Sequence, residues 1–144
     1  MVKIPVIFEI EGEAGFRKRE EATIADLTAL SNVVVATGGG AVLSAASREI
    51  LQSRGVVVYL RGSPEHLYER TRRDRNRPLL QTPDPLARMR EFYLLRDPLY
   101  REVADIIVDT GRQSVSNMTR VMCDRLDGLL STLPETKTDH ATNP

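Results

Sequence analysis

The chain has 144 residues, of which 41% are hydrophobic, and this size and composition predict one domain with one ordinary core. Twenty Lys and Arg residues balance twenty Asp and Glu residues, so no net field draws the whole molecule to nucleic acid or to an anionic membrane. The single cysteine, Cys123, excludes an internal disulfide, the apolar runs are too short to span a bilayer, and the first residues turn acidic too soon for a signal peptide, so we expect a cytoplasmic protein.

The first predicted helix begins near Phe16 and extends to about Leu30, and its first turn is rich in charge. Arg17 and Glu20 lie one turn apart, so Glu20 could hold the guanidinium in place for a carboxylate or hydroxyl ligand. A solvated, charged helix face explains the same residues, and from this segment alone it is the preferred interpretation.

Three short runs rich in β-branched residues predict strands: Asn32–Thr37, Gly55–Leu60 and Asp105–Thr110. Their apolar character is nearly continuous, which is typical of strands covered on both faces in a parallel sheet. Helical patterns alternate with them and indicate βαβ crossovers. The sequence therefore predicts an α/β fold in three layers, with a parallel sheet between flanking helices.

Three glycines, Gly38, Gly39 and Gly40, directly follow the first predicted strand and precede a helix that Ser44 or Ser47 could cap. Without Cβ atoms, successive glycines at the carboxyl end of a strand let a ligand touch the backbone. A tight turn that requires only one of the glycines is the alternative. Because each glycine carries an entropic cost, we favour a binding turn.

A helix is predicted from Ser63 to about Arg73, because a hydroxyl cap precedes Pro64 and an acid stands in the first turn. It leads into the basic stretch 70–80, which contains Arg70 and Arg77. A mobile loop with arginines can close over a phosphoryl donor and stabilise the charge that builds on transfer. An exposed linker has a similar composition, but the following Pro-Leu-Leu anchor favours Arg77 as the residue that acts on a substrate.

Two further helices are predicted on either side of the last strand. In the first, Arg96 shares one face with an apolar stripe that includes Tyr93 and Tyr100, so it points inward or into a cleft. In the second, a broad apolar face between residues 115 and 130 makes Cys123 core filler. Residues 131–144 are polar and aperiodic and are expected to form a disordered tail after a domain of residues 1–130.

Taken together, these segments resemble shikimate kinase from about Phe8 to Leu130. The resemblance is carried by FEIEGEAGFRKREE, VVVATGGGAVL, RGVVVYL, RTRRDRNRPLL and RDPLYREVADIIVDT in the family's order and spacing. It implies a P-loop kinase-like fold, in which the γ-phosphoryl group of ATP is transferred to the 3-hydroxyl of shikimate with Mg²⁺. It also implies a role in aromatic amino acid biosynthesis and, for a complete domain, a monomer.

The resemblance implies roles for single residues. Arg17 and Arg96 resemble the two arginines that grip the shikimate carboxylate, with Glu20 supporting Arg17. Gly39, between Gly38 and Gly40, resembles the backbone contact to the ring hydroxyls. On the nucleotide side, Arg77 resembles the catalytic lid arginine, Arg70 an adenine-packing residue, and Gln113 part of an adenine-side loop.

The family pattern also contains an opening strand and a G-x-x-x-x-G-K-[ST] loop, which this sequence lacks: its lysines, Lys3, Lys18 and Lys137, stand outside glycine loops. We therefore expect the ligands of ATP and Mg²⁺ to be largely missing and the chain to be inactive alone. We also expect it to be poorly folded, or to repair the gap by rearrangement or by binding a partner. Two alternatives remain. One is a non-catalytic remnant that binds shikimate-like carboxylates or a partner chain, and the other is a different small-molecule kinase of the same fold.

Overall fold

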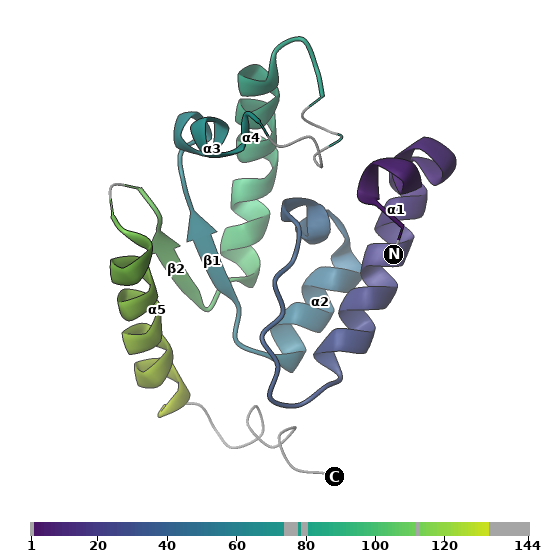
Figure 1. Cartoon of the computed structure of the whole chain (residues 1–144). Helices are drawn as coiled ribbons and strands as arrows, with labels where there is room; N and C mark the ends of the chain where they lie inside the picture. The colour runs from purple at the N-terminus through teal and green to yellow at the C-terminus, as the bar shows by residue number, and fades with distance from the viewer. Residues whose placement is uncertain (1, 74–77, 79–80, 112, 133–144) are drawn as a thin grey trace.

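The computed structural model describes residues 2–73, 78, 81–111 and 113–132. Within them, five α-helices and one 3₁₀ helix surround a sheet of two parallel strands (Figure 1). In chain order the elements are α1 Ile4–Thr28, η1 Gly39–Leu43, α2 Ala45–Arg54, β1 Val58–Arg61, α3 Pro64–Thr71, α4 Pro85–Val103, β2 Ile106–Asp109 and α5 Val115–Leu130.

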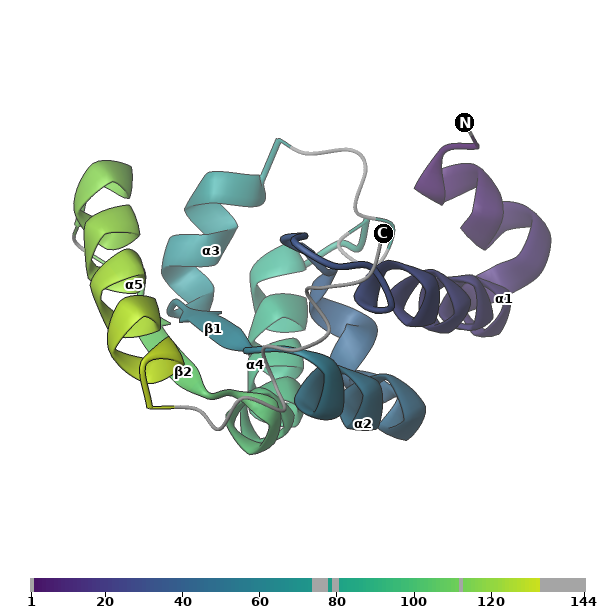
Figure 2. The ribbon, with the colours of Figure 1, turned by 90° about the horizontal axis from the view of Figure 1, so that it is seen from below.

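The two strands lie between helices, with α5 against β2 on one side and α4 across the other (Figure 2). Val58 pairs with Ile106 and Arg61 with Asp109, in the parallel register that the crossover through α3 and α4 requires. Ile106 and Val108 are buried, and Val108 is only 1% exposed. The predicted α/β class and the parallel pairing of the last two strands are therefore confirmed.

The helices α1 and α2 form a second packed group beside the sheet, joined to α4 through η1. The cap of α2 was predicted correctly, since the Ser44 hydroxyl accepts a hydrogen bond from the Ser47 amide at 3.1 Å. The start of α3 was also correct, because the Ser63 hydroxyl accepts from the His66 amide at 3.2 Å. Both caps use groups within one turn of each other, which sequence spacing determines.

Helix α1 is longer than predicted and is bent where Gly12 takes a positive φ of 72° with ψ near 180°. Such a backbone conformation belongs almost only to glycine. The bend separates a first helical segment, which begins at Ile4, from the segment that carries Arg17. The predicted start near Phe16 was therefore wrong: the segment with Arg17 begins soon after Gly12, and a further helical segment precedes it.

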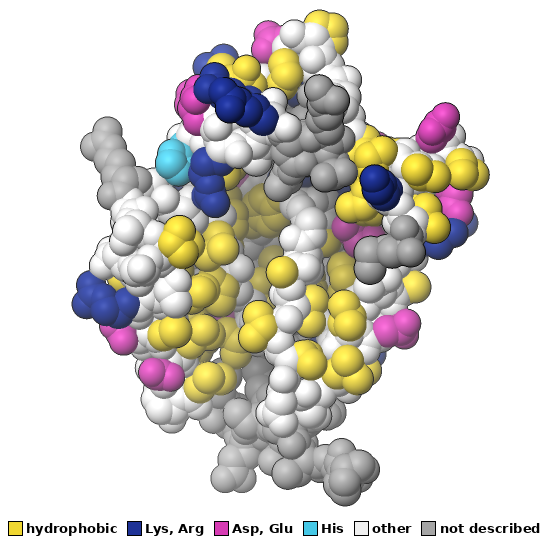
Figure 3. All heavy atoms as spheres, viewed as in Figure 1, with side chains coloured by type: hydrophobic (Ala, Val, Ile, Leu, Met, Phe, Trp, Pro, Cys, Tyr) yellow, Lys and Arg dark blue, Asp and Glu magenta, His cyan; other side chains and the backbone are white. Residues whose placement is uncertain are grey.

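The prediction that Asn32–Thr37 forms a strand of the sheet is wrong. Residues 33–38 have no strand assignment, and the sheet in the described part of the chain contains only β1 and β2. The valine run stays in solvent, where Val34 is 100% exposed and Val33 is 46% exposed. The residue types favour a strand, but a strand also needs a neighbour to complete its hydrogen bonds. Figure 3 shows hydrophobic side chains on both sides of a hollow in this face of the molecule.

The interpretation of Cys123 as core filler is also wrong, since this side chain is exposed. None of the residues in α5 is fully buried. The helix packs mainly against β2, and a sheet of two strands is too narrow to cover its broad apolar face. Within the described residues, none of the helices is long and apolar enough to cross a membrane. The predicted tail lies outside the described residues from residue 133 onward.

Candidate functional site

The glycine turn, defined as Gly38–Gly40, lies where η1 begins and meets both α1 and α4. Gly40 is buried, and the amide of Ala41 donates to the Gly38 carbonyl at 3.2 Å, which starts the 3₁₀ helix. The turn is therefore a compact backbone surface between two helices, each of which carries one of the predicted ligand-binding arginines.

Arg17 reaches this surface from α1. Its Nη1 donates to Oε1 of Glu20 at 2.7 Å, as the one-turn spacing predicted. Its Nη2 lies 3.5 Å from Oε1 of Glu13, and its guanidinium lies 5.2 Å from the centre of the Phe16 ring. The Arg17 side chain is 17% exposed, and its Nε is buried without a hydrogen-bond partner in the described structure.

Arg96 reaches the same surface from α4, as its place on the apolar stripe predicted. It is 9% exposed, and its guanidinium stacks 4.1 Å from the centre of the Phe92 ring. Burial lowers the pKa of Arg96 below its ordinary value, Tyr100 opposes this shift, and the charge of Arg17 adds to it. Its Nε is also buried, with no hydrogen-bond partner in the part of the chain that the structure describes. A carboxylate between these arginines would relieve both their repulsion and their missing hydrogen bonds.

Each glycine of the turn faces a different polar side chain. A Cβ atom on Gly38 would lie 3.4 Å from Oε2 of Glu20, and one on Gly39 would lie 3.3 Å from Nη1 of Arg96. A Cβ on Gly40 would overlap the Arg17 guanidinium, with Nη2 only 2.2 Å away. Gly39 and Gly40 therefore have little room for a side chain, because a Cβ there would force Tyr100 or Arg17 to shift, whereas a Cβ on Gly38 would make an ordinary contact.

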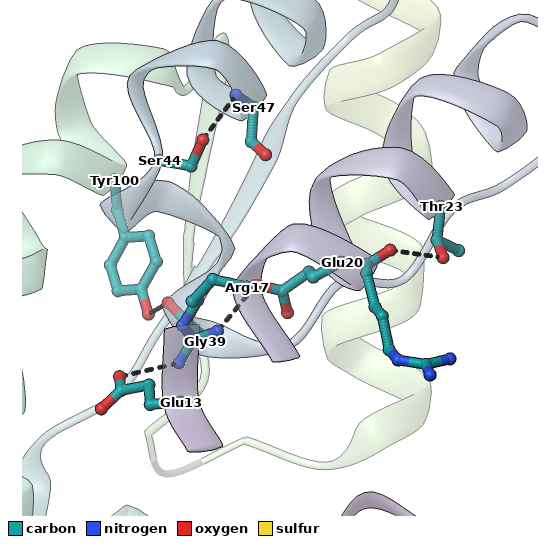
Figure 4. A network of polar contacts seen from close by, with 9 residues as sticks. Glu13, Arg17, Glu20, Thr23, Gly39, Ser44, Ser47 and Tyr100 are labelled. Atoms are coloured by element: carbon teal, nitrogen blue, oxygen red, sulfur yellow. Dashed lines mark hydrogen bonds and ion pairs between the residues drawn. The ribbon is translucent and has the colours of Figure 1, made fainter. Parts of the chain in front are cut away.

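Two residues that sequence reasoning did not assign to the site also belong to it (Figure 4). The Tyr100 hydroxyl donates to the Gly39 carbonyl at 2.5 Å. Glu13 pairs with Arg17 from the preceding turn. The available signals were their spacings, since Tyr100 follows Arg96 by four residues and Glu13 precedes Arg17 by four.

The predicted nucleotide-side residues are not brought to this cluster. Arg70 is exposed at the end of α3, where it lines a surface hollow of about 290 Å³ together with Arg72 and Arg73. The side-chain amide of Gln113, which follows β2, donates to the carbonyl of Asp109 at the end of that strand. Arg77 lies outside the described residues. Their nucleotide-binding roles remain predictions.

The arrangement has the chemistry of an anion site. Two guanidinium groups, whose Nε atoms have no hydrogen-bond partner within the described ranges, meet a backbone that has no side chains, and Glu20 fixes one of these groups. Planar guanidinium groups suit a carboxylate, because two parallel N–H groups can meet its two oxygens. The Arg17 side chain rests on Gly40.

Comparison with known proteins gives a consistent result over most of the chain. The family model described as "Shikimate kinase" matches residues 1–127. A shikimate kinase of Thiobacillus denitrificans is 71% identical over 126 residues, which cover 88% of this chain and 69% of that protein. One from Cupriavidus pinatubonensis is 59% identical over 126 residues, with 88% of this chain and 66% of the relative covered. A third, from Bordetella pertussis, is 53% identical over 125 residues that cover 87% of this chain and 59% of the relative. The chain thus spans about two thirds of these relatives.

Solved structures agree with the sequence matches. A shikimate kinase from Acinetobacter baumannii in complex with shikimate has a TM-score of 0.86 and 43% identity, over 92% of this chain and 73% of that one. A shikimate kinase from Bacteroides thetaiotaomicron has a TM-score of 0.74 and 28% identity, over 89% of this chain and 74% of that one.

Proposed function

The chain belongs to the shikimate kinase family, and we propose that it provides the shikimate-binding part of the transfer of the ATP γ-phosphoryl group to the shikimate 3-hydroxyl. The observation that carries the proposal is the pair of mostly buried arginine side chains at the glycine turn. Arg17 and Arg96 come from separate helices, and each has a buried Nε that finds no hydrogen-bond partner among the described residues. One ligand carboxylate between them satisfies both arginines.

The glycine turn supplies the second part of the proposed site. With the carboxylate held by the arginines, the ring of shikimate lies along the backbone of Gly38–Gly40, where Gly39 contacts ring hydroxyls. The missing Cβ atoms support this, because they let both arginines approach the turn: a Cβ on Gly40 would overlap Arg17, and one on Gly39 would lie 3.3 Å from Nη1 of Arg96. Glu20 keeps the Arg17 guanidinium in place through its 2.7 Å hydrogen bond.

The family implies ATP and Mg²⁺, and the groups in this chain do not fit them fully. In the part of the chain that the structure describes, no three His, Cys, Asp or Glu side chains form a group that could hold a metal ion. The three lysines of the sequence are also outside glycine loops, so the β- and γ-phosphates lack a cradle among these residues. We therefore propose that the chain alone binds shikimate and does not transfer phosphate. Arg77 as catalytic residue, with Arg70 and Gln113 near the adenine, remains part of the proposal.

The second candidate function is a non-catalytic protein that binds shikimate-like carboxylates. The same lack of a lysine-bearing glycine loop favours it. Both candidates predict shikimate binding through Arg17 and Arg96 and no phosphate transfer by the chain alone. Phosphate transfer by a chain completed with the family's phosphate-binding loop separates them. A monomeric state for the complete domain and a cytoplasmic location are further predictions.

The test is shikimate binding by arginine variants, measured by calorimetric titration. Arg17→Ala and Arg96→Ala are each expected to weaken binding by about ten- to a hundredfold, the range for losing a hydrogen bond to a charged group. Arg17→Ala should leave ATP binding, where detectable, nearly unchanged. Equal losses for shikimate and ATP would contradict the assignment.

The chain offers a matched control for each arginine. Arg88 lies over the Phe92 ring at 4.6 Å, as Arg96 does at 4.1 Å, but Arg88 pairs with Glu91 at the surface. Arg19 lies on α1 near Arg17 but pairs with Glu11 in solvent. Arg88→Ala and Arg19→Ala should therefore bind shikimate within about twofold of the original chain.

A further inference from the structure

The Tyr100 hydroxyl lies where α4 meets the glycine turn. It donates to the Gly39 carbonyl at 2.5 Å, and a Cβ atom on Gly39 would lie 2.9 Å from it. Tyr100 is one helical turn beyond Arg96, whose Nη1 approaches the same glycine. The Tyr100 hydroxyl therefore lies beside Gly39, the glycine that the Arg96 guanidinium also approaches.

The ring of Tyr100 packs against the ring of Tyr59, a residue of β1. The centres of the Tyr59 and Tyr100 rings are 4.7 Å apart with a tilt of 34°, a favourable aromatic arrangement. The Tyr59 hydroxyl donates to Oδ1 of Asp97 at 2.7 Å, and Arg101 Nε donates to Oδ2 at 2.8 Å. Burial raises the pKa of Tyr100, so its hydroxyl keeps the proton that it donates to the turn at neutral pH.

The turn's own chain restrains it only locally, through the 3₁₀ helix that begins at Gly39. Glycines lose the most conformational freedom on ordering, and the extended segment before the turn, residues 33–37, has no ladder partner in the described sheet. The Gly39 carbonyl and the Gly40 N–H belong to one planar trans peptide and point in opposite directions. A hydrogen bond that fixes the carbonyl therefore also fixes the direction of the Gly40 N–H.

We propose that Tyr100 is a positioning residue of the shikimate site, whose hydroxyl orients the Gly39–Gly40 peptide beside Arg96. It acts through the backbone of the turn and does not need to touch the ligand. This inference rests on the proposed function for the identity of the ligand. The contact between Tyr100 and the turn is independent of that identity.

The test replaces Tyr100 by Phe, which keeps the ring on Tyr59 and removes only the hydroxyl. Tyr100→Phe is expected to weaken shikimate binding by roughly three- to tenfold, the range for one neutral hydrogen bond. The matched control is Tyr59→Phe, which also loses a buried hydroxyl but leaves the glycine turn untouched. It should bind within about twofold of the original chain, so equal affinities of the two variants would overturn the proposal.

Amide hydrogen exchange without ligand separates this inference from the proposed function. Tyr100→Phe should speed exchange at Gly39, Gly40 and Ala41 by at least about threefold relative to Tyr59→Phe, since the peptide is no longer fixed. If the original chain does not bind shikimate, the proposed function fails, and faster exchange would still support the positioning role. Unchanged exchange at these amides would overturn that role whether or not shikimate binds.

Discussion

Single atoms decide the geometry of the anion site, most clearly at Gly40. The Arg17 guanidinium lies where a Cβ atom on this glycine would be, at 2.2 Å from Nη2. The sequence showed three glycines in a row, but only the structure assigns each one a neighbour. The absence of a side chain at Gly40 thus leaves room for a charged group from another helix.

Gly40→Ala should therefore displace Arg17 and weaken shikimate binding by at least about tenfold, because a contact below 3 Å cannot be accommodated without a shift. Calorimetric titration measures the effect. Gly128→Ala is the control, since Gly128 lies in α5 with open space around its Cβ position. The control should bind normally and be slightly more stable. Normal binding by Gly40→Ala would show that Arg17 is not held against the turn.

Asp97 links two elements, because its carboxylate accepts from Tyr59 on β1 and from Arg101 on α4. Burial raises the pKa of Asp97, but the hydrogen bonds from Arg101 and Tyr59 outweigh it and hold the pKa below the ordinary value of 3.8. A lowered folded-state pKa means that the ionised form is stabilised in the folded protein. This contribution is present above the ordinary value and is lost as the pH falls through the folded pKa.

The melting temperature of Asp97→Asn should accordingly lie below that of the original chain at pH 7, and the gap should close as the pH is lowered below about 4. Thermal unfolding followed by circular dichroism across this range measures it. A gap that stays constant from pH 7 to pH 3 would contradict the role of the ionised carboxylate in joining β1 to α4.

At the level of elements, features that depend on neighbours in sequence were predictable. The caps at Ser44 and Ser63 involve hydrogen bonds across three residues, and both were expected. The segment Asn32–Thr37 was not, because its residue types favour a strand while strand formation depends on a distant partner. The exposure of Cys123 was missed for the same reason, since it depends on how much sheet is present under α5.

The candidate site divides in the same way. The inward position of Arg96 and the support of Arg17 by Glu20 follow from helical spacing, and the structure confirms both placements. The bond from Tyr100 to Gly39 spans 61 residues, and sequence periodicity carries no information about such a contact. Periodicity assigns a residue to a face of its helix, whereas only the packing of α4 against η1 identifies what that face meets.

The whole molecule exposes more apolar surface than its two-stranded sheet can cover. Val34 is 100% exposed, and Val33 and Leu60 are each nearly half exposed. An extended, unpaired run of valines can pair with another chain, which predicts association at high concentration. Val34→Lys should reduce light scattering without lowering the melting temperature, because no contact is lost. Increased scattering by Val34→Lys would contradict this account.

Val108→Ala should lower the free energy of unfolding by about 2 kcal/mol or more, since Val108 is 1% exposed in the core.

The central claim is that a ligand carboxylate is held between Arg17 and Arg96 at the glycine turn. Calorimetric titration of the chain with shikimate and with its methyl ester tests it most directly, because the ester keeps the ring and the hydroxyls but has no charge. The account predicts that the ester binds at least about tenfold more weakly than shikimate, as expected for the loss of charge-assisted hydrogen bonds. Equal affinity for the acid and the ester would contradict it.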